Sequence, residues 1–170
     1  MKILIKTIFL LFIFTNISSA NLIKPNSNLD PFEVLMIQLN SLKNNNKPYK
    51  DAGIEQTWEF AHPSNKKITG PLDKFKKMIY SESYKILISH ENTEIKILKE
   101  TKDISVFKVI VLTKNKEKYY YIWQVEKVLL EGNFKNCWMT TSVSNPKYIG
   151  EVIWPKNLII FVRNAKKKTK

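Results

Sequence analysis

The stretch YYYIWQV, residues 119–125, decides the fold of this chain. Alternate residues of a strand lie on the same face of a sheet, so a period of two indicates a strand with one buried face. Here the alternate positions hold large apolar side chains, Tyr119, Tyr121, Trp123 and Val125. The stretch therefore predicts the clearest strand of the chain.

Further strand patterns lie on both sides of this stretch. Residues 104–112 are apolar on both faces, which predicts a strand in the centre of a sheet. Residues 94–97, Glu-Ile-Lys-Ile, alternate polar and apolar, so they predict a strand with one face in water. Residues 134–143 predict another strand, preceded by a hairpin turn at Gly132-Asn133.

The first half of the chain carries helix signals instead. Asp30 can cap a helix, Pro31 suits its first position, and Glu33 sits where a capping box has its acid. An apolar stripe at helical spacing follows, formed by Phe32, Leu35, Met36, Leu39 and Leu42. The polar segment 44–48, which ends in a proline, is predicted to end this helix.

Two shorter helices are predicted next. Asp51 can cap the second helix and Pro63 stops it. Its apolar face is formed by Ile54, Trp58 and Ala61. Residues 64–70 are predicted to form a loop, and Pro71 opens the third helix. The apolar side of that helix is formed by Leu72, Phe75 and Met78.

Helices therefore come first and strands follow, without the alternation of strand and helix that a parallel sheet requires. This order predicts an α+β fold. We expect three N-terminal helices packed on one face of a curved, mainly antiparallel sheet.

Residues 1–20 predict a cleavable signal peptide. Lys2 and Lys6 give the N-terminus positive charge, an apolar core begins at residues 8–13, and small residues lead to a cut site after Ala20. A transmembrane anchor is the alternative, but it needs about 20 apolar residues, and this run is shorter. We expect an exported protein, periplasmic or secreted, with no stable membrane insertion after cleavage.

The rest of the chain suits one domain, since domains cluster near ~100–150 residues. We expect a polar leader at residues 21–29, the α+β domain at 30–145, a C-terminal extension at 146–164 and a basic tail at 165–170. Within the extension, residues 152–154 and 158–162 predict two strands split by Pro155, or a strand followed by a short terminal helix.

Charge and cysteine content argue against several classes of protein. The net charge is +13, and without Lys2 and Lys6 it is 26 − 15 = +11. Arg163 is the sole arginine, whereas nucleic-acid readers rely on arginine for bidentate contacts, so we expect no nucleic-acid partner. One cysteine cannot form an intramolecular disulfide. Without CxxC or HExxH motifs we expect no metal site, and we expect no cofactor.

Several blocks occur in order between residues 30 and 143. They are Asp30-Pro31-Phe32-Glu33-Val34-Leu35, Gln38-Leu39, Asp51-Ala52-Gly53-Ile54, Trp58-Glu59-Phe60-Ala61, Pro63-Ser64-Asn65, Thr69-Gly70-Pro71-Leu72, Phe75, Tyr84, Leu87, Tyr121-Ile122-Trp123 and Cys137-Trp138-Met139-Thr140. Together they resemble a bacterial and plant chloroplast family, domain of unknown function 4864. The resemblance implies the cone-shaped fold of the nuclear transport factor and ketosteroid isomerase superfamily. It implies no activity, because the family has none assigned.

The superfamily's usual pocket lies between the first helices and the concave face of the sheet. Candidates for its lining are Trp58, Phe60, Tyr119, Tyr121, Trp123 and Trp138. The alternative is that these rings simply fill the core. An isomerase-type site would need a base and a neutral donor in an apolar pocket, and the candidates are Asp51, His62, Tyr119 and Tyr121. Asp51 and His62 also have structural roles open to them, as a helix cap and as the residue before Pro63.

Two further features have alternative interpretations. Cys137 could be a nucleophile, but free cysteine more often acts as a small buried apolar group. The polar segment 63–71 could bind a partner, or its residues could serve turn geometry alone.

We therefore expect a non-enzymatic small-ligand-binding or protein-interaction domain of the cell envelope. The expected partners are a small apolar ligand and a second copy, bound through the outer face of the sheet. The alternative is an isomerase- or dehydratase-like enzyme acting on a small apolar molecule in the cone pocket. Fold alone does not decide between them.

Overall fold

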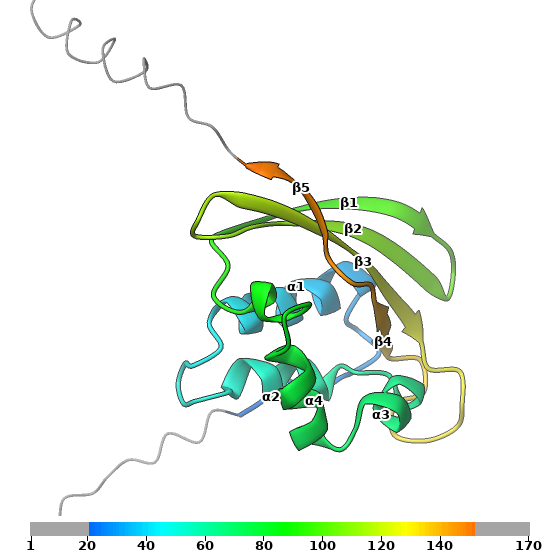
Figure 1. The fold of residues 1–170 in the computed structure, drawn as a ribbon. Coiled ribbons are helices and arrows are strands. Elements are labelled where there is room, and N and C mark those ends of the chain that lie inside the picture. Colours follow the sequence, from blue (N-terminus) through cyan, green and yellow to red (C-terminus); the bar gives the residue numbers. More distant parts are fainter. Residues whose placement is uncertain (1–20, 152–170) are drawn as a thin grey trace, which may run out of the picture.

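The computed structural model describes residues 21–151 and has the predicted α+β class (Figure 1). The helices are α1 (Pro31–Lys43), α2 (Ala52–Glu59), α3 (Pro63–Thr69), α4 (Leu72–Ile79) and the 3₁₀ helix η1 (Lys85–Leu87). The strands are β1 (Asn92–Glu100), β2 (Ile104–Leu112), β3 (Glu117–Lys127), β4 (Trp138–Val143) and β5 (Lys147–Glu151). The helices lie on one face of the sheet. Within residues 21–151, no helix has the length and hydropathy needed to cross a membrane.

The start of α1 confirms the predicted capping box. The Asp30 carboxylate accepts the Glu33 backbone N–H at 2.7 Å, and the Glu33 carboxylate accepts the Asp30 backbone N–H at 2.9 Å. The predicted stripe is only partly right, because Phe32 is 44% exposed and Met36 is half-buried. The buried face turns instead toward α2, β3 and β4 and consists of Pro31, Val34, Leu35, Gln38, Leu39 and Leu42.

The start of α2 corrects the predicted cap. Asp51 has φ 66° and its side chain caps nothing. Asn45, just after α1, caps α2 instead, because its side-chain oxygen accepts the Ile54 N–H at 2.9 Å. Its backbone carbonyl accepts the Gly53 N–H at 3.0 Å. Residues from the preceding turn therefore hold α2 against α1, which frees the Asp51 carboxylate to accept the Tyr80 hydroxyl.

The predicted loop at residues 64–70 is wrong, because α3 occupies it. Pro63 takes the first helical position rather than stopping a helix, and His62 is the cap before it. No residue of α3 is buried, so its sequence carries no apolar stripe from which to recognise a helix. The third predicted helix is confirmed as α4, with Phe75 and Ile79 buried.

β3 is the centre of the sheet. The strand order is β1-β2-β3-β4, and every pair of strands is antiparallel. β2 runs along one edge of β3, and β4 and β5 share the other edge. β4 pairs with residues 123–127 of β3 and β5 with residues 117–120. The stretch quoted first is thus hydrogen-bonded on both sides.

The predicted strand 134–143 starts later, at Trp138. Residues 132–137 form turns instead, with Lys135 N–H donating to Gly132 and Cys137 N–H to Phe134. These local bonds use the groups that a longer strand would offer to β3. β5 lies within the segment assigned to the C-terminal extension, and the patterns at 152–154 and 158–162 lie outside the described residues.

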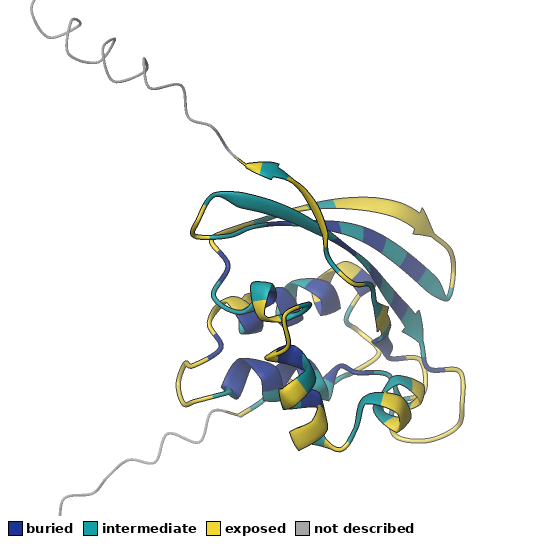
Figure 2. Ribbon diagram, in the orientation of Figure 1, coloured by how far each residue is buried: buried dark blue, intermediate teal, exposed yellow. Residues whose placement is uncertain are grey.

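The core lies between the helices and the inner face of the sheet (Figure 2). That face is formed by Phe107, Val109 and Val111 of β2 and Tyr121, Trp123 and Val125 of β3. The opposite side chains of β2 are half-buried, as the Val106 and Ile110 positions show. β1 is largely exposed, and a bulge interrupts its pairing between Ile97 and Lys99.

The polar leader is attached to the domain. Gln56 of α2 accepts the Ile23 N–H at 2.7 Å and donates to the Ile23 carbonyl at 2.8 Å. One side-chain amide thus bonds both backbone groups of Ile23, as a neighbouring strand would. Gln56 is buried, so these two bonds supply the hydrogen-bond partners that its amide cannot obtain from water.

Gly53 sets the distance between α1 and α2. A Cβ at this position would lie 2.0 Å from the Ser41 carbonyl oxygen, which belongs to the backbone and cannot turn aside. We expect Gly53→Ala to lower the free energy of unfolding by about 3 kcal/mol or more, because the helices must separate. Urea unfolding measures this. The matched control is Gly132→Ala, where φ is +136° but no atom lies within 4 Å of the new Cβ; we expect it to cost about 1–2 kcal/mol. Equal costs would contradict the packing argument.

Candidate functional site

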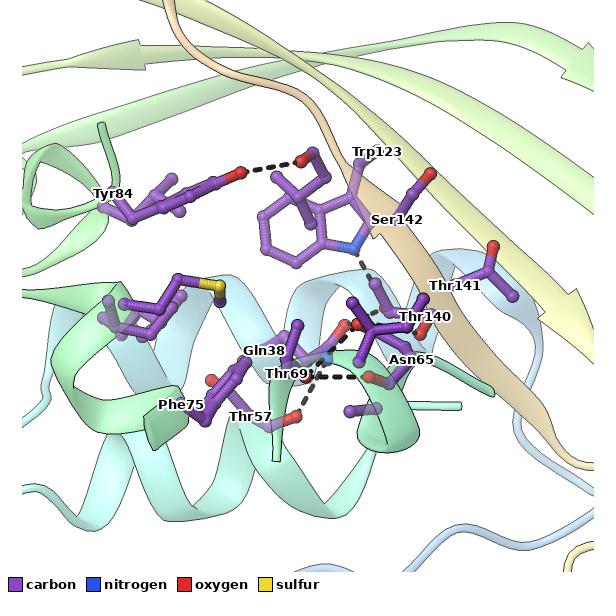
Figure 3. A pocket seen from close by; sticks show the side chains of 17 residues that line it. Gln38, Thr57, Asn65, Thr69, Phe75, Tyr84, Trp123, Thr140, Thr141 and Ser142 are labelled. Atoms are coloured by element: carbon purple, nitrogen blue, oxygen red, sulfur yellow. Dashed lines mark hydrogen bonds between the residues drawn. The ribbon is translucent and has the colours of Figure 1, made fainter. Parts of the chain in front are cut away.

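A cavity of about 240 Å³ lies between the helices and the β4 side of the sheet (Figure 3). Its lining comes from α1, α2, α3, α4, η1, β3, β4 and two connecting segments. The lining residues are Gln38, Leu42, Thr57, Ala61, Asn65, Ile68, Thr69, Phe75, Met78, Ile79, Tyr84, Leu87, Trp123, Thr140, Thr141, Ser142 and Val143.

Buried polar side chains form one wall. The Thr140 hydroxyl donates to the Gln38 side-chain oxygen at 2.6 Å and accepts the Trp123 indole N–H at 3.0 Å. The Gln38 amide nitrogen donates to the Thr57 carbonyl at 3.0 Å. Gln38 and Thr140 are 1% and 3% exposed, so these bonds replace the water that both side chains lose on folding.

Backbone bonds hold Thr140 in place. Its N–H donates to the Phe60 carbonyl and its carbonyl accepts the His62 N–H, each at 2.8 Å. These bonds form a short parallel bridge between β4 and the junction of α2 and α3. The Asn65 amide donates to the same carbonyl at 3.3 Å, and the Thr69 hydroxyl donates to the Asn65 carbonyl at 2.9 Å. The polar wall is thus fixed by both layers.

The facing wall is apolar. It consists of Leu42, Phe75, Met78, Ile79 and Leu87, which come from α1, α4 and η1. Figure 3 shows Phe75 and Tyr84 on this side, and Thr140 and Asn65 on the other. Helical spacing places Phe75, Met78 and Ile79 on one face of α4.

The cavity reaches the surface between α3 and the end of β4. Ile68 on α3 is 73% exposed and Ser142 on β4 is also exposed. Trp123 and Leu87 are each 1% exposed and lie deep. The half-buried Tyr84 donates its hydroxyl to the Val143 carbonyl at 3.0 Å, which ties the segment before η1 to β4.

The lining is uncharged. None of its residues is Asp, Glu, Lys, Arg, His or Cys. Burial raises the pKa of Tyr84, because the phenolate would lose its hydration, so this hydroxyl stays protonated at neutral pH. Lys66 of α3 is outside the lining and holds its ammonium 5.2 Å from the centre of the Trp58 ring. Within residues 21–151, no three His, Cys, Asp or Glu side chains are grouped closely enough to hold a metal.

The six aromatic candidates are dispersed. Trp123 is in the cavity lining, and the other five are not. Phe60 is fully buried in the core, and Tyr121, also buried, donates to the Ser83 carbonyl at 2.8 Å. Trp58 packs on Phe75 with ring centres 5.0 Å apart. Two remain: Tyr119 contacts Tyr148 edge-on at 5.3 Å, and Trp138 lies under the Lys127 ammonium at 5.1 Å.

The structure does not bring the catalytic candidates together. Asp51 lies at the turn between α1 and α2, bonded to Tyr80 and 3.9 Å from the Lys76 ammonium. His62 caps α3 through Nδ1, which accepts the Ser64 N–H at 3.2 Å. Neither lines the cavity, and neither do Tyr119 and Tyr121.

Cys137 has the environment of a packing residue. It is 3% exposed and packs with Val128 and Met139. Burial raises the pKa of its thiol, which opposes formation of the nucleophilic thiolate.

Sequence reasoning missed the polar wall. Gln38 was the available signal, because it lies between Leu35 and Leu42 on the buried face of α1, where a lone polar side chain needs a buried partner. Its partners, Thr140 and Thr57, are distant in sequence and have no pattern of their own. They become visible only once β4 and α1 are placed together.

No family model, curated protein or solved structure matches the chain. The resemblance to domain of unknown function 4864 therefore stays a prediction that the quoted blocks alone carry.

Thr140→Val tests the polar wall. The change keeps the side-chain shape but leaves the Gln38 oxygen and the Trp123 indole N–H buried without their partner. We expect it to lower the free energy of unfolding by about 3 kcal/mol. In the control, Thr141→Val, the hydroxyl is half-buried and water can replace its bonds, so we expect less than about 1 kcal/mol. Similar urea midpoints for both variants would contradict this account.

His62 makes the start of α3 sensitive to pH. Burial lowers the pKa of His62 in the folded protein, so the unfolded chain binds the proton more readily. The stability linked to neutral His62 is present above about pH 6.5 and is lost as pH falls through the folded pKa. His62→Asn keeps a capping oxygen that does not titrate. We expect its stability to fall less than that of the parent between pH 7 and 5 in urea titrations. Burial also lowers the pKa of His90, but this residue is present in both proteins and affects both stability curves alike. Parallel pH curves would refute the role of His62.

Proposed function

We propose that this chain is a small-ligand-binding domain of the cell envelope, with the ligand in the cavity between the helices and β4. One observation carries the proposal: a cavity with an uncharged lining that joins a wall of bonded polar groups to an apolar wall. Binding sites are mostly apolar, with a few placed polar groups that orient the ligand. The cavity volume is below the ~300–1,000 Å³ of drug-sized sites, so the ligand is small.

The envelope location rests on the signal-peptide pattern at residues 1–20, which lie outside the described residues. The family proposal rests on the quoted sequence blocks. Four helices followed by an antiparallel sheet are compatible with the cone-shaped fold that this resemblance implies. Association of two copies through the outer face of the sheet remains part of the proposal.

Chemistry of the lining favours binding over catalysis. Isomerases and dehydratases need a base placed beside the substrate, with a pKa suited to proton transfer. The one lining residue whose side chain titrates is Tyr84, and burial raises its pKa, so the hydroxyl stays protonated at neutral pH and is not available as a base. Asp51 and His62 lie outside the cavity, each with a hydrogen-bonded structural role.

A cavity-filling variant tests the proposal. Thr69→Phe adds a ring at the end of α3 that lines the cavity, whereas Lys67→Phe adds the same ring on the exposed side of that helix. A fragment library with neutral and charged members is screened by thermal shift on the parent and both variants. We expect fragments that stabilise the parent and Lys67→Phe but not Thr69→Phe. A screen in which no fragment shows this dependence overturns the proposal.

A further inference from the structure

Hydrogen bonds fix the orientation of the Gln38 amide. A carbonyl oxygen can only accept, so the Thr57 carbonyl must face the NH₂ group of Gln38. The Thr140 hydroxyl then donates to the other end, the amide oxygen. This arrangement cannot be flipped without setting two acceptors against each other. The side chain is therefore held in one orientation, which defines the hydrogen bonds it can still form.

The hydrogen-bonding groups that the polar wall still offers to a ligand are mainly donors. Gln38 has two amide hydrogens and its bond to Thr57 uses one. Asn65 likewise uses one amide hydrogen on the Thr140 carbonyl. Thr140 has committed its one hydrogen to Gln38, so its hydroxyl can only accept further bonds. A ligand oxygen suits this wall, with room for one donor toward Thr140.

The charge of the lining restricts the ligand further. An ion that enters loses its hydration, which is costly unless an opposite charge replaces it. The lining supplies no such charge, and the Lys66 ammonium of α3 contacts the Trp58 ring and donates to the Glu59 carbonyl. The ligand must therefore be neutral.

The opposite wall determines the rest of the ligand. Leu42, Phe75 and Leu87 present apolar surface, and Met78 adds an adaptable thioether. A hydrocarbon or aromatic body gains by leaving water for this wall. Both kinds of surface line one small cavity, so head and body belong to one compact molecule.

We propose that the cavity selects an uncharged amphipathic molecule, whose carbonyl or hydroxyl oxygen is bound by Gln38 and Asn65 and whose apolar body lies against α4 and η1. This inference rests on the proposed function and adds the chemical class of the ligand. The ligand enters between α3 and the end of β4, beside Ile68 and Ser142.

Four probes with the same ring test the class: benzamide, benzoate, benzylamine and toluene. Benzamide is neutral with a polar head group, benzoate is an anion, benzylamine is a cation, and toluene is neutral without a polar head group. Affinities are measured by NMR titration of the Trp123 indole signal in the full chain, with Thr69→Phe as the blocked control. We expect benzamide to bind at least about tenfold more tightly than the other three, because it alone meets both walls without burying a charge.

Gln38→Glu tests the head group. It removes the amide donors and introduces a carboxyl group of the same shape, so we expect benzamide to lose about tenfold in affinity and benzylamine to gain. Asn65→Asp makes the same change at a half-buried position, and it serves if the first variant does not fold.

The outcomes separate the two proposals. If benzoate, benzylamine or toluene binds as tightly as benzamide, and Thr69→Phe blocks that binding, the ligand class is overturned but a binding cavity is supported. Absence of any binding that Thr69→Phe blocks overturns the proposed function and this inference with it.

Discussion

The hydrogen bonds of Thr140 are the constraint on which the rest of the structure depends. Apolar burial holds the helices on the sheet, but it has no direction and does not fix where one layer stands against the other. Thr140 supplies that direction, because its backbone bonds to Phe60 and His62 and its side chain to Gln38, 102 residues away. The same bonds that align the layers therefore also shape the cavity.

The elements that the sequence revealed are those whose burial has a period. β3 buries every second side chain at Tyr121, Trp123 and Val125, and α4 places Phe75 and Ile79 one turn apart on the buried side. The cap at Asp30 was also readable, because a capping box is local in sequence. α3 was not, because none of its residues is buried. Asp51 was misread because Asn45, in the turn after α1, supplies the cap.

The site was harder to predict than the fold. Aromatic side chains were reasonable candidates, yet a ring gains as much by filling the core as by lining a cavity, and sequence does not distinguish the two. Phe60 and Tyr121 fill the core. Trp123 both packs in the core and lines the cavity, and its indole N–H donates to the Thr140 hydroxyl. The polar wall depends on tertiary pairing. Gln38 was visible as an anomaly on α1, but its partner on β4 was not.

β1 leaves one edge of the sheet without a neighbouring strand among the described residues, and Ile97 and Leu98 there are more than half exposed. Such an edge can recruit the backbone of another molecule and start aggregation. Two properties of the strand oppose this. The bulge between Ile97 and Lys99 breaks the row of free backbone groups, and Lys96 and Lys99 place charged side chains on the strand, which disfavours pairing with another edge. The edge is thereby guarded against fibril-like stacking while its backbone stays open to water.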